Sequence, residues 1–188
     1  MYLYIGLVHY PVYNKNNERI ASAISTVDLH DIARVAKTYD VRKFFVITPL
    51  VDQQVLAERI RRHWTNGFGA GYNSDRKDAF ELVAIVPSLE QAILTTTEIE
   101  GKVPLLIATD ASIQNDRSIS YERAREIIQD SRVIILLFGT AWGLDKSIID
   151  RADYVLDPIS GKSNYNHLSV RAAAAIVLDR LACGECVR

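Results

Sequence analysis

Short apolar runs alternate along the chain with segments that have the spacing of helices. The apolar runs occupy residues 2–9, 41–48, 82–86, 105–109, 132–138 and 154–156. They show no regular alternation of apolar and polar positions, which is typical of strands buried on both faces, as in a parallel sheet. The pattern therefore predicts a sheet that is covered on both sides.

Helical patterns fill the intervals between the apolar runs. Capping residues predict the start of a helix at each of the following positions: Asp28, Asp52, Ser88 and Ser120. Two further helices are predicted over residues 140–149 and 168–181. Strands that alternate with helices predict an α/β fold, in which a mostly parallel sheet is flanked by helices. No internal repeat or linker divides the chain, so we expect a single domain over residues 1–188.

Two longer polar segments do not fit this alternation and are predicted as loops. The first spans residues 9–26, and the second reads N-G-F-G-A-G-Y-N-S at residues 66–74. The glycine-rich segment lacks the G-x-G-x-x-G spacing of a dinucleotide site and does not stand between an N-terminal strand and a helix. We interpret it as a surface loop and not as a phosphate cradle.

The charge balance limits the partners that the protein attracts. With 22 Lys and Arg against 23 Asp and Glu, the formal net charge is -1. Bulk attraction to nucleic acid or to an anionic membrane is therefore absent, and RNA binding needs a local patch. We expect neither a DNA nor a membrane partner, since no run approaches 18 consecutive apolar residues and no signal-peptide pattern opens the sequence.

Cysteine and histidine usage points to no metal chemistry. Cys183 and Cys186 stand at the end of the chain, which excludes a disulfide framework and indicates a reducing, cytoplasmic compartment. We interpret this pair as incidental. The 4 histidines form no ligand pair at helical spacing, so no metal site is expected.

Basic residues gather locally at the end of the second predicted helix. Arg59, Arg62 and His63 share one helix face, because they are three and four residues apart. Trp64 follows them, and Arg76 comes after the glycine-rich segment. These residues form a candidate strip for RNA phosphates, with an aromatic side chain for base stacking. The alternative interpretation is a solvated helix face.

The last third of the chain carries the strongest candidate for a ligand site. The buried run at residues 132–138 ends in F-G-T-A-W-G-L, where Gly139 and Gly143 let the backbone approach a ligand closely. A tight loop, D-P-I-S-G, follows at residues 157–161, and polar residues then lead into the last predicted helix. Loops of this composition at strand ends predict one shared pocket.

These segments resemble the SPOUT class of S-adenosylmethionine-dependent RNA methyltransferases. F-G-T-A-W-G-L is similar to the second motif of the class, and N-H-L-S-V-R-A-A-A-A-I at residues 166–176 is similar to the third. D-L-H-D-I-A-R-V-A-K-T-Y at residues 28–39, followed by F-F-V-I-T-P, is similar to the first motif of the ribose-methylating branch. The forms FGTxWGL and YNHLSVR resemble a bacterial subgroup, members of which are found fused to a tRNA guanine-N1 methyltransferase.

The resemblance implies a deep trefoil knot in the C-terminal half, S-adenosylmethionine as the methyl donor, and a homodimer that binds RNA. It implies donor binding by the following residues: Thr109, Phe138, Gly139, Thr140, Gly143, Ile159, Asn166, Leu168 and Ser169. It places Arg34, Asn166 and Ser169 in catalysis, and Arg171 joins the candidate RNA contacts.

The resulting prediction is an RNA methyltransferase that acts on tRNA at the ribose 2′-oxygen. Asp28 stands where the first motif usually has asparagine, and this difference keeps open a non-catalytic RNA-binding module of the same fold. Methylation of a base nitrogen is a further alternative. An ordinary nucleotide-binding enzyme of doubly wound type is disfavoured, since the sequence has no phosphate loop.

Overall fold

The computed structural model describes residues 2–112, 117–162 and 165–182. In this part of the chain a seven-stranded sheet has the order β5-β4-β1-β8-β6-β9-β7, and all of its neighbouring pairs are parallel. Its strands are β1 (Leu3–Val8), β4 (Phe44–Ile47), β5 (Val83–Val86), β6 (Leu105–Thr109), β7 (Ser118–Ile119), β8 (Ile134–Gly139) and β9 (Tyr154–Leu156). The predicted α/β fold with a mostly parallel sheet is confirmed.

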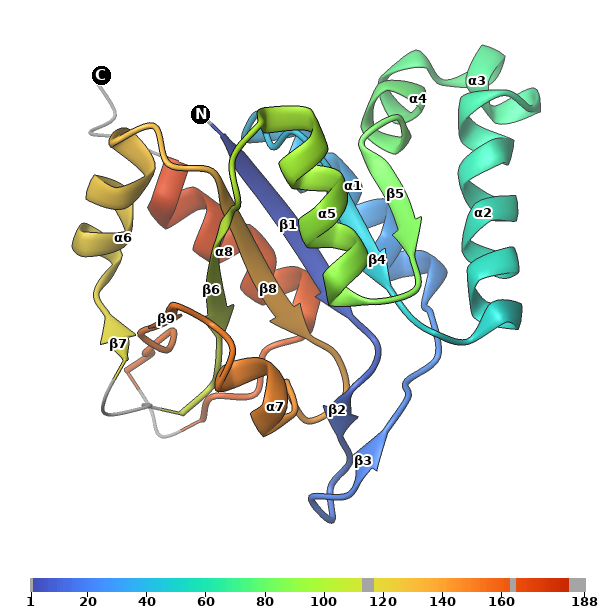
Figure 1. Ribbon diagram of the computed structural model, residues 1–188. Helices are drawn as coiled ribbons and strands as arrows, with labels where there is room; N and C mark the ends of the chain where they lie inside the picture. Colours follow the sequence, from blue (N-terminus) through green and yellow to red (C-terminus); the bar gives the residue numbers. More distant parts are fainter. Residues whose placement is uncertain (1, 113–116, 163–164, 183–188) are drawn as a thin grey trace.

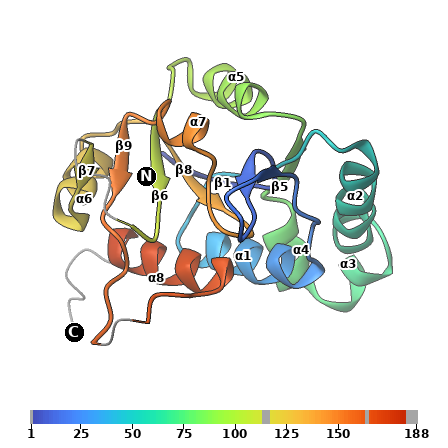
Figure 2. The same cartoon turned by 90° about the horizontal axis from the view of Figure 1, so that it is seen from below.

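Two layers of helices cover the sheet (Figures 1 and 2). On one side lie α1 (Thr26–Thr38), α2 (Val51–Thr65), α4 (Ser74–Phe80), α6 (Tyr121–Gln129) and α8 (Val170–Ala182), and on the other α5 (Leu89–Glu100) and α7 (Lys146–Ile149). The short helix α3 (Phe68–Tyr72) follows α2 at the margin of the molecule. Among the residues that the structure describes, no helix combines the length and apolarity needed to cross a membrane.

Strand β1 shows why the apolar runs are continuous. Leu3, Ile5 and Leu7 belong to the core under α1 and α8, whereas Tyr4 and Val8 belong to the core under α5 and α7. Successive side chains of a strand point to opposite faces, so a strand between two helical layers needs apolar residues at every position. Each predicted apolar run contains one strand of the sheet, and β7, with a single apolar residue, was not predicted.

Most predicted helices are present, with shifted ends. Ser88 and Ser120 cap α5 and α6 as expected, since their side chains accept hydrogen bonds from the backbone N–H groups of Gln91 and Arg123. The helix α1 instead begins at Thr26, so Asp28 lies in its first turn and is not its cap. The helix predicted over residues 140–149 was wrong in its first half, because the backbone of Ala141 and Gly143 is left-handed, with φ of 51° and 105°.

Both segments predicted as loops contain regular structure. Residues 9–26 include an antiparallel hairpin, β2 (Val12–Tyr13) with β3 (Arg19–Ile20), and residues 66–74 include α3. Cys183 and Cys186 lie outside the described residues. The knot implied by the resemblance stays a prediction.

Candidate functional site

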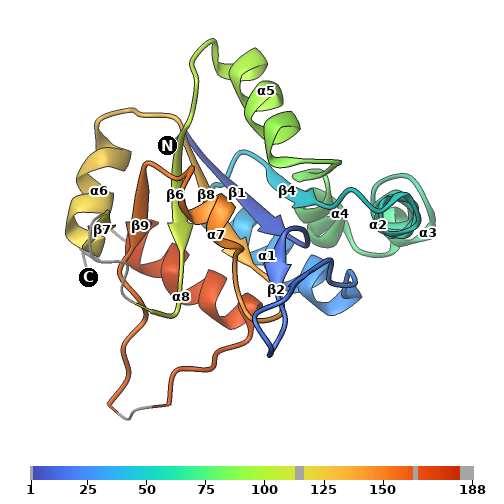
Figure 3. The ribbon, with the colours of Figure 1, turned by 60° about the horizontal axis from the view of Figure 1, so that its bottom comes forward.

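A cavity of about 710 Å³ lies where β6, β8 and β9 end. Parallel strands bring their carboxyl ends to one edge of the sheet, and ligands of open α/β sheets bind in the crevice outside that edge. Figure 3 shows these strand ends on the same side as the segment that leads into α8. The volume is in the range of sites for small molecules and cofactors.

The loops predicted to share one pocket do meet at this cavity. Every residue that the resemblance implies for donor binding lines it: Thr109, Phe138, Gly139, Thr140, Gly143, Ile159, Asn166, Leu168 and Ser169. Asn166 is held in place by its side-chain amide, which donates to the carbonyl of Ala111 over 3.0 Å. The structure thus brings these residues together, and their role in binding the donor stays a prediction.

The turn after β8 has no room for a side chain at Gly139. A Cβ atom there would lie 2.5 Å from the backbone nitrogen of Leu144 and 2.7 Å from the carbonyl carbon of Gly143. The turn closes with a hydrogen bond of 3.0 Å from the N–H of Gly143 to the carbonyl of Thr140. This tight turn gives the wall of the cavity a defined backbone path.

The hairpin of β2 and β3 braces the same turn from outside. The N–H of Tyr13 donates to the carbonyl of Gly143 over 3.1 Å, and the N–H of Trp142 donates to the carbonyl of Tyr13 over 3.0 Å. Arg19 donates two hydrogen bonds to the buried carboxylate of Asp145, at 3.0 and 2.9 Å. The segment between residues 9 and 26 therefore positions the cavity wall, a role that its polar composition did not indicate.

Burial by itself would raise the pKa of Asp145. Hydrogen bonds from Arg19 and Ser147 outweigh burial and lower that pKa from its ordinary value of 3.8 to about 2. A lowered pKa in the folded state means that the ion pair stabilises the fold above pH 3.8, and that this stabilisation is lost as the pH falls towards 2.

Replacing Arg19 by Met is expected to lower the free energy of unfolding at pH 7, because the buried carboxylate of Asp145 would lose its cationic partner. The difference from the wild type should shrink between pH 4 and pH 2. Urea unfolding at several pH values measures it, with the exposed Arg132→Met as control. A difference that does not change with pH would show that Arg19 acts through packing instead.

A buried hydrogen-bond chain connects β1 to the cavity. Thr140 donates to the carbonyl of Val8 over 3.0 Å, and its Oγ1 lies 2.5 Å from the hydroxyl of Ser22, which lies 3.0 Å from Nδ1 of His9. Since the Thr140 hydrogen is used on Val8, Ser22 donates to Thr140, and Nδ1–H of His9 donates to Ser22. Burial lowers the pKa of His9 to about 4, so this imidazole is neutral at physiological pH.

Asp28 also lines the cavity, a position that the sequence analysis did not predict for it. Its Oδ1 accepts a hydrogen bond of 2.9 Å from Arg171, a residue expected to contact RNA. Arg171 also lies 3.5 Å from Asp31. The signal that could have identified Asp28 was its departure from asparagine in the first motif.

The chemistry of the lining fits S-adenosylmethionine. Apolar walls from Phe138, Leu156 and Ile159 suit an adenine ring, while the carboxylates of Asp110 and Asp157 are acceptors for hydroxyl or ammonium groups. Tyr121 also lines the cavity, and its hydroxyl is buried. These groups would hold the donor by hydrogen bonds and apolar contact.

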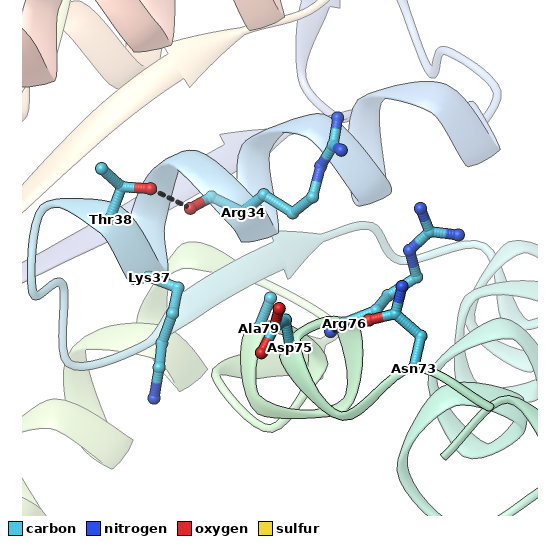
Figure 4. A pocket seen from close by; sticks show the side chains of 7 residues that line it. All are labelled: Arg34, Lys37, Thr38, Asn73, Asp75, Arg76 and Ala79. Carbon is cyan, nitrogen blue, oxygen red and sulfur yellow. Dashed lines mark hydrogen bonds between the residues drawn. The ribbon is translucent and has the colours of Figure 1, made fainter. Parts of the chain in front are cut away.

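Of the predicted catalytic residues, Asn166 and Ser169 lie at the cavity and Arg34 does not. The hydroxyl of Ser169 accepts a hydrogen bond from the N–H of Ala172 over 3.3 Å. Arg34 is 56% exposed, pairs with Asp31 at 2.7 Å, and lines a separate hollow between α1 and α4 (Figure 4).

The basic residues predicted on α2 are exposed, whereas the aromatic residue beside them, Trp64, is half-buried. Arg59, Arg62 and His63 are exposed on α2, and Arg62 pairs with Glu58 at 2.8 Å. Trp64 is packed against Phe80, and the guanidinium of Arg76 lies over its ring at 4.6 Å from the centroid. Trp64 is half-buried by these contacts, so part of its ring is closed to base stacking.

Comparisons with known proteins show which family the chain belongs to. A family model described as "SAM-dependent RNA methyltransferase" matches residues 2–183. A tRNA (guanine-N(1)-)-methyltransferase from Oleidesulfovibrio alaskensis is 41% identical over 179 residues, which cover 95% of this chain but 41% of that protein. A protein from Aquifex aeolicus described as uncharacterized is 36% identical over 180 residues, covering 95% of this chain and 87% of that protein. The chain thus spans less than half of the first relative and most of the second.

A solved structure shares the fold. The SpoU methyltransferase AviRb from Streptomyces viridochromogenes, in complex with the cofactor AdoMet, aligns with a TM-score of 0.60 and 16% identity. The alignment covers 96% of this chain and 57% of that one. At this identity the likeness shows the fold alone.

Proposed function

This chain belongs to the family of SAM-dependent RNA methyltransferases, and from that premise we propose that it methylates tRNA, with a ring nitrogen of guanine as the acceptor atom. The Oleidesulfovibrio relative is named for methylation of tRNA, and this chain spans 41% of that protein, so the name supports tRNA as the substrate. The more general prediction from the motifs, a SPOUT-class RNA methyltransferase that uses S-adenosylmethionine, is confirmed by the family match and the shared fold.

The observation that carries this proposal is the carboxylate of Asp28 in the cavity. Guanine has a proton on N1, which must be lost for that nitrogen to attack an electrophile, and a positioned carboxylate is a suitable base. The hydrogen bond from Arg171 to Oδ1 orients the group. Oδ2 makes no hydrogen bond or ion pair with any other residue of the described part, so it is available to accept the proton.

Catalysis otherwise rests on positioning. S-adenosylmethionine supplies an electrophilic methyl group when it is bound. Transfer needs the acceptor nitrogen in line at about 3 Å, which the walls of the cavity have to enforce. The tight turn at Gly139, the brace from the hairpin and the chain from His9 to Thr140 all restrict the motion of one wall.

The ribose 2′-oxygen is the second candidate acceptor, favoured by the similarity of residues 28–39 to the first motif of the ribose-methylating branch. In that branch the position of Arg34 serves to activate the acceptor hydroxyl. Arg34 does not line the cavity of this chain. A ribose acceptor would therefore need a base other than Arg34 within the chain, and Asp28 is again the available group.

Nucleoside analysis distinguishes these acceptors. The protein is incubated with unmodified tRNA transcripts and S-adenosylmethionine carrying a labelled methyl group, and the digested product is analysed by mass spectrometry. We expect label in 1-methylguanosine. Label in a 2′-O-methylnucleoside would overturn the base nitrogen and keep the tRNA substrate. Donor binding without any transfer would support the non-catalytic RNA-binding module.

We also propose that the protein acts in the cytoplasm as a homodimer. Large apolar side chains are exposed near the cavity, with Trp142 at 65%, Tyr165 at 72% and Leu168 at 45% exposure. Trp142 and Leu168 belong to the cavity lining itself. Exposed apolar groups gathered around one site are typical of a contact surface, and they support assembly of two chains across this edge.

A further inference from the structure

The hollow between α1 and α4 is distinct from the donor cavity. It has a volume of about 340 Å³, and its lining residues come from these two helices and the residue before α4: Arg34, Lys37, Thr38, Asn73, Asp75, Arg76 and Ala79. Figure 4 shows the guanidinium groups of Arg34 and Arg76 on the same side of the hollow, with Lys37 pointing away from them along α1. The hollow is lined by three cationic side chains and one carboxylate, that of Asp75, while Arg34 also pairs with Asp31 at its rim over 2.7 Å.

The positive charge of this hollow is incompletely neutralised. Arg76 makes no ion pair with any residue of the described part, and its Nε is buried there without a hydrogen-bond partner. His30 reports the local potential, because burial and then the charges of Arg76 and Arg34 lower its pKa. Like charges held together in this way are stabilised when an anion binds between them.

Packing holds Arg76 ready for such an anion. Its guanidinium lies over the ring of Trp64, and its backbone N–H donates to the side chain of Asn73 over 2.9 Å. A guanidinium held flat against an aromatic ring loses little further freedom when it pairs with the oxygens of a phosphate.

Two exposed aromatic rings stand next to the hollow in the chain. Phe68 and Tyr72 of α3 are 81% and 77% exposed, and their rings stack on each other with centroids 6.1 Å apart. Tyr72 directly precedes Asn73, which lines the hollow. A basic hollow beside open aromatic faces is the combination that binds unpaired nucleotides, through the phosphate and through the base.

We propose that this hollow binds a phosphate of the acceptor RNA, and that Phe68 and Tyr72 stack against an unpaired base of the same strand. The inference rests on the proposed function for its partner, an RNA. It gives Arg34 a role in positioning the RNA strand, and it replaces Trp64 with the α3 pair as the stacking surface.

Binding of tRNA at several salt concentrations tests the phosphate contact. In fluorescence titrations with labelled tRNA, Arg76→Gln is expected to weaken binding and to reduce the slope of log affinity against log salt by about 1. Lys37→Gln, on an exposed residue whose change leaves the packing intact, should reduce the slope in the same direction. Arg132→Gln, an exposed arginine that lies before the central strand β8 and does not line the hollow, is the matched control.

The stacking contact has a different signature. The double variant Phe68→Ala, Tyr72→Ala is expected to bind tRNA about tenfold more weakly than the wild type. The slope of log affinity against log salt should not change, because stacking releases no counterions. Leu94→Ala, an exposed apolar residue of α5 on the other side of the sheet, is the control.

The outcomes separate this inference from the proposed function. If folded Arg76→Gln and Lys37→Gln proteins keep the wild-type salt slope while the wild type binds tRNA, the hollow is not a phosphate site and the proposed function stands. If the aromatic variant binds as the wild type does, the stacking surface is overturned. A wild type that fails to bind tRNA overturns both the inference and the proposed acceptor.

Discussion

Asp28→Asn is expected to slow methyl transfer to tRNA by about 10² to 10⁴-fold, the usual contribution of a general base. Asparagine has nearly the same shape as aspartate and can still accept the hydrogen bond from Arg171. It cannot take up a proton from the acceptor. Binding of S-adenosylmethionine, measured by calorimetric titration without RNA, should therefore stay close to that of the wild type.

Asp52→Asn is the matched control, because Asp52 also lies in the first turn of a helix but is exposed on α2. It should change neither transfer nor donor binding. If Asp28→Asn loses donor binding as much as transfer, Asp28 is part of the donor site and not a base. Unchanged transfer would place the base elsewhere.

Gly139→Ala is expected to abolish measurable donor binding and to lower the melting temperature by roughly 5–10 °C. The added Cβ would meet backbone atoms of Leu144 and Gly143 at 2.5 and 2.7 Å, so the turn itself has to move. Overpacking of this kind costs about 1–3 kcal/mol, and each kcal/mol shifts the midpoint by about 2–4 °C in a chain of this size. Thermal unfolding and calorimetric titration measure the two effects.

Gly71→Ala serves as the control for this variant, since a Cβ at Gly71 meets nothing within 4 Å. It should leave both the melting temperature and the donor affinity near their wild-type values. A Gly139→Ala protein that binds the donor normally would show that the turn can relax, and that close packing at Gly139 is not what shapes the cavity.

The order of elements could be predicted from the sequence because it depends on local patterns. A strand buried on both faces needs a continuous apolar run, and the runs that contain β1 and β8 have one. The contacts of the hairpin could not be predicted. Arg19 and Asp145 are 126 residues apart, and no local pattern around either residue indicates its partner. Such a pair becomes visible only when the chain has folded.

The glycine-rich segment shows how tertiary contact overrides propensity. Glycine disfavours helices, yet Gly69 lies in α3, where a Cβ atom would come within 2.6 Å of the ring of Trp64. Glycine is needed at position 69 because the ring of Trp64 leaves no room for a side chain, and not because the backbone there requires the conformational freedom of glycine. The same contact covers part of the Trp64 ring.

The residues that the resemblance assigns to the donor all line one cavity, whereas Arg34, assigned to the acceptor, lies elsewhere, and this difference has a physical reason. Donor residues cluster in short motifs at strand ends, which the parallel sheet brings to one edge. The acceptor side depends on which face of α1 each side chain occupies. Asp28 lies at the cavity, whereas Arg34 lies at the α4 hollow.

The pairing of β1 with β8 has a consequence for the order in which the protein folds. Leu3 pairs with Ile134, so the centre of the sheet joins the start of the chain to its last third. During synthesis β1 can pair with β4 and β4 with β5, while the other edge of β1 stays open until β8 emerges. An open, fully apolar edge invites pairing with other chains. Premature termination before β8 would therefore leave an aggregation-prone fragment, and the donor site would form only after that edge had closed.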